Sequence, residues 1–285
     1  DLRCTGEPER RQPGENAPRR PCVAVLGGGF AGIGAARALK DAEADVVLVD
    51  EHDYHTFQPL LYQLATDLLP TEVVGHPLRD LFHEQPNVAI HQDAVTGVDL
   101  ASRQVHFAEM APLDYDYLVL ALGARVNFFG TDGTPDHAFP MYTLADAVRL
   151  KEHVLRRWEA ADKDPALADD GALNVVVVGG GPTGVESAGA LAELYTGDLA
   201  DDYPSLSPDK ARVTLVEASP ALLTMFKKDI QTYTKKALEE RGVEILLGEL
   251  VASVSPTRVT LKSGTVLKAH TLVWGAGLQG NALVQ

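Results

Sequence analysis

VAVLGGGFAGIGAARAL, residues Val23–Leu39, is the stretch that decides the fold, because its G-x-G-x-x-G pattern follows a β-branched run and precedes a helix-forming run. A second copy, VVVVGGGPTGVESAGAL, occupies Val175–Leu191. The two copies agree at nine of seventeen positions without a gap, so each supports the interpretation of the other. Turns of this kind bind the pyrophosphate of a dinucleotide, and the chain is therefore predicted to bind two dinucleotides and pass electrons between them.

The three glycines of each copy have separate tasks. The first allows the tight turn, the second leaves room for a pyrophosphate against the backbone, and the third lets the helix pack closely on the strand. In this order they are Gly27, Gly29 and Gly32 in the first copy, and Gly179, Gly181 and Gly184 in the second.

An acid ends the strand that follows each copy. Asp50 closes ADVVLVD, and Glu217 closes VTLVE after an acidic insertion at Gly197–Lys210. A carboxylate at this position hydrogen-bonds the ribose of a dinucleotide, and it would repel a 2′-phosphate. The second site is therefore predicted to prefer NADH over NADPH. A strand-end acid that is merely solvated is the alternative.

The remaining pattern predicts an α/β protein with two Rossmann-like domains. Strands are expected at Val23–Leu26, Asp45–Asp50, Asn87–His91, Tyr117–Leu122, Leu173–Val178, Val213–Glu217, Val243–Leu246 and Thr271–Trp274. Helices are expected from the first turn to Asp41, near Leu60–Leu69 and His76–Glu84, over Thr143–Ala161, from the second turn to Tyr195, and over Asp229–Arg241. Leu60, Leu61, Leu64 and Leu68 are expected to form a core stripe.

Composition excludes several classes of function. The chain has 285 residues, a formal net charge of -15 and a pI near 4.9, which argues against a nucleic-acid partner. Its longest apolar runs are far shorter than the roughly 20 residues of a membrane-spanning helix. Its two cysteines, Cys4 and Cys22, form no C-x-x-C pair, which disfavours disulfide-reducing chemistry, and no metal-ligand spacing is present.

Three further segments carry a family resemblance. They are YHTFQPLLYQLATDLL at Tyr54–Leu69, YDYLVLALGARVNFFG at Tyr115–Gly130 and TLVWGAG at Thr271–Gly277. Together with GGGPTGVESAGALAEL, they resemble type II NADH dehydrogenase, the single-subunit, flavin-containing NADH:quinone oxidoreductase of the respiratory chain. The HTFQPLLYQ element is the most specific of them.

The resemblance orders the two turns, with FAD in the first and NADH in the second. It implies an FAD/NAD(P)-binding fold in which the NAD domain is inserted in the FAD domain. The expected ranges are a mobile leader at 1–21, an FAD-binding domain at 22–140, an NADH-binding domain at 141–277, and a return to the FAD domain at 278–285.

The resemblance also implies the site residues. For FAD they are Gly27, Gly28, Gly29, Phe30, Ala31 and Gly32 at the pyrophosphate, Asp50 and Glu51 at the ribose and adenine, His55, Gln58 and Pro59 near the flavin, and Val95 through its backbone. For NADH they are Gly179, Gly181, Pro182, Thr183, Gly184 and Glu217. Gly123 and Gly277 are further cofactor-binding candidates.

Glu186 matches the glutamate that the family places close to the flavin and nicotinamide, where it takes part in quinone chemistry and proton delivery. A structural alternative exists, because Thr183 and Glu186 also fit a capping box at a helix start. Asp67 departs from the family, which usually has glycine there.

The implied partners are a quinone and a second copy of the chain. The implied location is peripheral, on the cytoplasmic face of the cell membrane, through a C-terminal segment outside this chain. Such a segment and a second FAD motif would follow TLVWGAG, so the chain is expected to be a fragment. The alternatives are a soluble NAD(P)H reductase of a small electron carrier and a nucleotide-binding protein without turnover.

Overall fold

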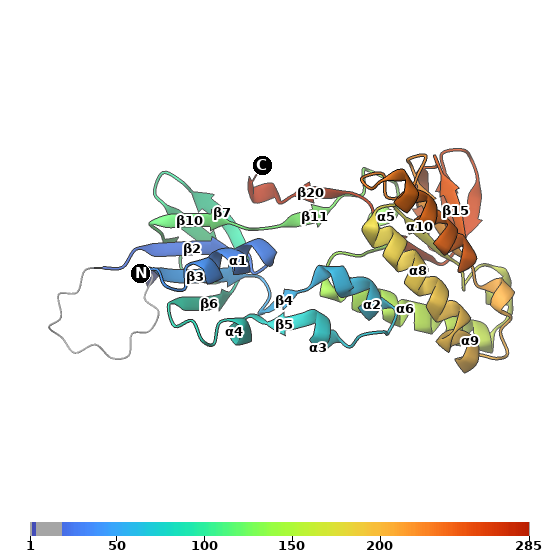
Figure 1. The fold of residues 1–285 in the computed structure, drawn as a ribbon, viewed down its shortest axis with the longest axis horizontal. Helices are drawn as coiled ribbons and strands as arrows, with labels where there is room; N and C mark the ends of the chain where they lie inside the picture. Colours follow the sequence, from blue (N-terminus) through green and yellow to red (C-terminus); the bar gives the residue numbers. More distant parts are fainter. Residues whose placement is uncertain (1, 4–18, 285) are drawn as a thin grey trace. The chain divides into compact units, whose positions relative to one another are not determined.

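The computed structural model describes residues 2–3 and 19–284 (Figure 1). The chain divides into two compact units. The first comprises Asp1–Thr56, Gly75–Arg125 and Gly280–Gln285, and the second comprises Phe57–Val74 and Val126–Gln279. The second unit therefore interrupts the first in two places. The units change at residues 125 and 126 rather than at the predicted residue 140, and Phe57–Val74, predicted within the FAD-binding domain, groups with the second unit. Most of the predicted leader lies outside the described residues.

The first unit is built on a parallel sheet in the order β10-β2-β3-β6 (Figure 1). A second sheet, in the order β1-β9-β8-β7, belongs to the same unit. The elements are β1 (Leu2–Arg3), β2 (Cys22–Leu26), α1 (Phe30–Ala38), β3 (Asp45–Asp50), β4 (Tyr54–Thr56), β5 (Gly75–Pro77), α4 (Leu78–Leu81), β6 (Val88–Gln92), β7 (Val95–Asp99), β8 (Gln104–Phe107), β9 (Leu113–Asp114), β10 (Tyr117–Leu120) and η3 (Ala282–Val284). The strands β11 (Ala124–Val126) and β20 (Leu278–Gly280) pair with each other.

The second unit repeats this plan with a parallel sheet in the order β12-β19-β13-β14-β15 and an antiparallel sheet in the order β16-β17-β18. Its elements are η1 (Gln58–Leu60), α2 (Leu61–Ala65), α3 (Thr71–Val74), α5 (Thr134–His137), β12 (Ala138–Pro140), α6 (Leu144–Lys163), α7 (Ala166–Asp169), β13 (Val175–Val178), α8 (Pro182–Thr196), α9 (Asp198–Asp202), η2 (Pro208–Lys210), β14 (Val213–Glu217), α10 (Lys228–Glu240), β15 (Val243–Leu247), β16 (Val251–Ser255), β17 (Arg258–Leu261), β18 (Val266–Lys268) and β19 (Thr271–Trp274).

Both faces of each parallel sheet are buried, which explains the continuous apolar runs of the glycine-bearing strands. In β13, Val175 and Val177 pack with the helices, whereas Val176 and Val178 pack with β16–β18. The two side-chain sets alternate because successive residues of a strand point to opposite faces. In the strands of the first unit, one set of side chains likewise packs with α1 and α4, and the other set packs with β7–β9.

Most predicted elements are present, and the deviations have local causes. The strands Asp45–Asp50, Val213–Glu217 and Thr271–Trp274 have the predicted bounds. The single helix expected over Leu60–Leu69 is instead η1 followed by α2, and Leu68 is 55% exposed, so its predicted place in the core stripe is wrong. Leu61 and Leu64 are buried as expected.

Within residues 2–3 and 19–284, no helix is both long and apolar enough to span a membrane.

Candidate functional site

The first cradle, defined as Gly27–Gly32 with Asp50, lies between β2 and α1. Asp50 accepts hydrogen bonds from the backbone N–H groups of Gly28 (2.6 Å) and His52 (2.8 Å). Gly27 has a φ of +109°, a conformation that glycine adopts most readily. Asp50, at the end of β3, therefore fixes the middle of the glycine turn that follows the neighbouring strand β2.

The second cradle, defined as Gly179–Gly184 with Glu217, repeats this construction between β13 and α8. Glu217 accepts from the N–H groups of Gly180 (2.5 Å) and Ser219 (2.6 Å), and Gly179 has a φ of +110°. The repeated sequence thus produces the same local geometry twice.

The glycine tasks predicted from the sequence are visible in both cradles. A β-carbon on Gly32 would overlap the carbonyl oxygen of Gly27, and one on Gly184 would overlap that of Gly179. By contrast, a β-carbon on Gly29 or on Gly181 would meet nothing within 4 Å. The space beside these two second glycines is therefore open, and it lies at the first turn of a helix whose N–H groups attract a phosphate.

A leucine covers the middle glycine of each cradle, and neither leucine is predicted from the sequence. Leu78 of α4 lies 2.8 Å from the position of a β-carbon on Gly28, and Leu222 lies at the same distance from one on Gly180. Both leucines are buried. The sequence carries no signal for them, since each follows its acid in a segment without a motif.

Most of the remaining candidates of the first unit lie around its cradle. His55 is buried, shares a hydrogen bond from Nδ1 to the Gly28 carbonyl (3.1 Å), and meets the Phe30 ring edge-on at 4.9 Å. Ala31 lies in the first turn of α1.

Glu51, Val95 and Gly123 lie close to the cradle along the chain or across the sheet. Glu51 is exposed and follows Asp50 directly. Val95 follows Asp93, whose N–H donates to the Asp50 carbonyl (2.9 Å). Gly123, with a φ of +65°, ends the segment after β10.

Gln58 and Pro59 belong to the second unit, where both are exposed. The Gln58 side chain donates to the Tyr142 carbonyl (3.4 Å). Gly277 accepts from the Asn127 N–H (3.0 Å) and follows Gly275, which packs against Gly179.

Glu186 lies in α8 one helical turn after Pro182, on the same exposed face. The capping-box alternative is wrong, because Pro182 takes the first helical position and Gly181 becomes the N-cap, so Thr183 lies inside the helix. Among the described residues, the Glu186 carboxylate has no hydrogen-bond or ion-pair partner. Although the side chain is exposed, its surroundings remove enough water to raise the pKa of Glu186 above its ordinary value.

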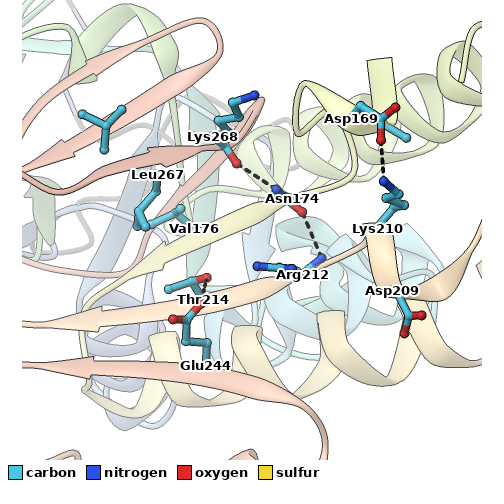
Figure 2. A pocket seen from close by; sticks show the side chains of 12 residues that line it. Asp169, Asn174, Val176, Asp209, Lys210, Arg212, Thr214, Glu244, Leu267 and Lys268 are labelled. Carbon is cyan, nitrogen blue, oxygen red and sulfur yellow. Dashed lines mark hydrogen bonds and ion pairs between the residues drawn. The ribbon is translucent and has the colours of Figure 1, made fainter. Parts of the chain in front are cut away.

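A polar pocket of 360 Å³ lies at the other end of the second unit's sheet (Figure 2). Its side chains bond mainly to one another and to nearby backbone: Lys210 pairs with Asp169 (2.5 Å) and Thr214 donates to Glu244 (3.2 Å). Dinucleotides bind at the carboxyl ends of parallel strands, whereas this pocket lies at the amino ends of β13 and β14. The two cradles, and not this pocket, therefore lie at the sheet ends where such sites occur.

The sequence pattern of the pyridine nucleotide-disulphide oxidoreductase family matches residues 21–285. The chain is 35% identical over 283 residues to the type II NADH:quinone oxidoreductase of Mycobacterium tuberculosis, covering 96% of this chain and 61% of that protein. It is 31% identical to the type II NADH:quinone oxidoreductase of Staphylococcus haemolyticus, covering 94% of this chain and 67% of that protein. The chain thus spans about three fifths to two thirds of the length of these relatives.

Among solved structures, the NDH2 of Plasmodium falciparum in complex with NADH superposes with a TM-score of 0.88. The match covers 93% of this chain and 57% of that one at 24% identity, so it supports the fold. The duplicated cradles, the family pattern and the curated relatives agree. The chain therefore belongs to the pyridine nucleotide-disulphide oxidoreductase family and, within it, to the type II NADH:quinone oxidoreductases.

Proposed function

We propose that the chain binds FAD in the first cradle and NADH in the second, and that it transfers hydride from NADH to the flavin and then two electrons to a quinone. The observation that carries the proposal is the pair of cradles, each with an open second glycine and an acid fixed at the strand end. Two such sites in one chain suit a reaction between two dinucleotides.

The residues present fit these two ligands. Space for a pyrophosphate is left beside Gly29 and beside Gly181, where any larger residue would intrude. The acids Asp50 and Glu217 would accept from ribose hydroxyls, and Glu217 favours NADH over NADPH because a 2′-phosphate would be repelled. Bound FAD supplies the redox chemistry, since its isoalloxazine accepts a hydride and passes electrons on. The protein contributes binding, orientation and electrostatics.

Glu186 is proposed as the proton donor to the reduced quinone. Two electrons and two protons convert a quinone to a quinol, so a protonated group is needed. Because partial desolvation raises the pKa of Glu186, its carboxyl keeps a proton to higher pH than an ordinary glutamate. Its freedom from partners among the described residues leaves it available for proton exchange.

The spectrum of the purified chain tests the main proposal. We expect a flavin absorbance that NADH bleaches without oxygen, and that a soluble quinone restores. Fast reoxidation by a small iron–sulfur carrier together with slow reoxidation by quinone would favour the carrier reductase instead. A chain that neither binds nor is reduced by NADH would contradict the proposal.

The Glu186→Gln variant tests the proton donor. We expect quinone reduction to fall by about a hundredfold, a typical contribution of a general acid, while bleaching by NADH keeps its rate. In the unsubstituted protein, quinone reduction should decline as pH rises through the raised pKa of Glu186, and in the variant this decline should be absent. Unchanged quinone kinetics across pH would remove Glu186 from the mechanism.

The proposal includes a peripheral position on the cytoplasmic face of the cell membrane and a homodimer, both implied by the family resemblance. Membrane fractionation after high-salt washing, together with the mass of the purified protein in solution, tests these two points.

A further inference from the structure

The loop of residues 218–226, between β14 and α10, is tied to the middle of the second cradle. The N–H of Leu223 donates to the Gly180 carbonyl (2.8 Å), and Leu222 packs over Gly180. The loop begins directly after Glu217, whose carboxylate is expected at the adenosine ribose. It therefore borders the adenosine end of the proposed NADH site.

This loop contains a strained residue. Leu223 has a φ of +49°, in the left-handed region that a bulky side chain rarely adopts. Such conformations persist only where the surrounding structure holds them, and they collect at ligand-binding segments.

One side chain of α10 holds the loop in place through hydrogen bonds. The amide nitrogen of Gln231, in the first turns of α10, donates to the Phe226 carbonyl (2.8 Å) and also reaches the carbonyls of Thr224 (3.4 Å) and Leu223 (3.5 Å). Three carbonyls within four residues of the loop are thus gathered onto one donor group. Among the described residues, no other side chain of α10 donates a hydrogen bond to this loop.

The held loop presents apolar side chains to solvent. Met225 is 73% exposed and Phe226 is 47% exposed, and the two are neighbours in sequence. The Phe226 N–H donates to the carbonyl of Leu223 (2.8 Å), the residue whose own N–H bonds to the cradle. Adjacent exposed apolar residues that are held rigidly are typical of a ligand-binding surface, because a flat aromatic ring or base can cover them.

We propose that Gln231 is a positioning residue that holds residues 218–226 so that Met225 and Phe226 form the wall against which the adenine of NADH packs. The inference rests on the proposed function, since it concerns the same second cradle. It adds the residues that grip the adenosine half, which the glycine motif does not contain.

Calorimetric titration of the whole chain with NADH and with ADP-ribose, which lacks nicotinamide, tests the proposal. We expect Gln231→Met, which keeps the side-chain length without the donor, and Phe226→Ala to raise both dissociation constants about tenfold. The maximal rate at saturating NADH should stay within twofold. Phe226→Ala removes only an exposed ring, so the test does not depend on the folding of the Gln231 variant.

The matched controls are Thr232→Val and Tyr233→Ala on the same helix. The Thr232 hydroxyl bonds within α10, and Tyr233 is 71% exposed. Both controls should bind either ligand as the unsubstituted chain does.

Three outcomes would overturn the inference. In the first, Gln231→Met lowers the melting temperature with unchanged affinities, which would show that Gln231 only stabilises the start of α10. In the second, Phe226→Ala changes the oligomeric mass with unchanged affinities, which assigns the exposed pair to a second copy. In the third, the controls weaken binding as much as the test variants. An unsubstituted chain that binds ADP-ribose but not NADH would instead contradict the proposed function, and the loop would still be tested by ADP-ribose.

Discussion

Asp67 shows how a single residue can replace a glycine. Its φ is +62°, so it adopts the left-handed conformation that the glycine usual at this position of the family would adopt. Aspartate tolerates this region better than most side chains. The conformation ends the short helix α2, and the carboxylate pairs with Lys151 of α6 (2.5 Å). The departure from the family motif therefore keeps the turn and adds an ion pair.

Substitution at Asp67 should separate backbone strain from the ion pair. We expect Asp67→Ala to lower the unfolding free energy by about 1 kcal/mol, because alanine keeps the strained φ and lacks the charge. The unfolding free energy of Asp67→Gly should stay within about 0.5 kcal/mol of the parent value, because relief of the backbone strain offsets the loss of the ion pair. Urea unfolding measures both. Lys151→Met isolates the ion pair, and an Asp67→Gly variant less stable than Asp67→Ala would contradict the explanation.

At the scale of the element, each cradle is a strand, a glycine turn and a helix locked by an acid from the neighbouring strand. The lock uses both carboxylate oxygens on backbone N–H groups, Gly28 with His52 in the first unit and Gly180 with Ser219 in the second. The acid thus shapes the turn as well as offering an acceptor to ribose. Because these bonds lie within the protein, they hold the turn in shape, which reduces the ordering cost of binding.

Three alanine substitutions, one at the N-cap of α1 and two within the helix, should separate the tasks of its glycines. Gly32→Ala should destabilise the first unit by about 3 kcal/mol, because its β-carbon would overlap a backbone oxygen. Gly29→Ala should leave stability within about 1 kcal/mol and lower the flavin content, because it fills open space beside the helix start. Gly34→Ala, also in open space but within α1, should raise stability by about 1 kcal/mol and keep the flavin. Thermal melting and flavin absorbance provide the two readouts, and flavin loss in Gly34→Ala would refute the assignment.

The parts of the site that the sequence predicts are those defined by local backbone geometry. The turns of the two cradles require glycine at fixed spacings, and their strands require continuous apolar runs, so both are readable from the chain. Leu78, Leu222 and Gln231 were not predicted, because their roles come from contacts across the fold. The capping box at Thr183 failed for a local reason, since proline at the first helical position moves the N-cap to Gly181.

On the scale of the whole chain, the two units are interleaved in sequence. The segment Phe57–Val74 is separated from the rest of the second unit by Gly75–Arg125, yet it contributes Leu61, Leu64 and Val74 to that unit's largest core. There α2 packs with α6 and α8. The continuous stretch Val126–Gln279 therefore lacks part of its own interior.

A fragment comparison should expose this dependence. We expect Val126–Gln279 alone to melt without cooperativity, since each missing buried leucine removes about 2 kcal/mol of burial free energy. The same fragment joined to Phe57–Val74 by a flexible linker should melt cooperatively and bind NADH. Circular dichroism and a binding titration measure the difference. A cooperative transition of equal midpoint in both fragments would contradict the assignment.

The interleaving also orders events on the ribosome. The segment Phe57–Val74 is synthesised early, but its packing partners α6 and α8 follow only by Lys163 and Thr196. At about 5–20 residues per second, its leucines wait roughly ten seconds without their native partners. During this interval the segment exposes apolar side chains. A holding chaperone could bind it, and it could aggregate if translation stalls before α8 is complete.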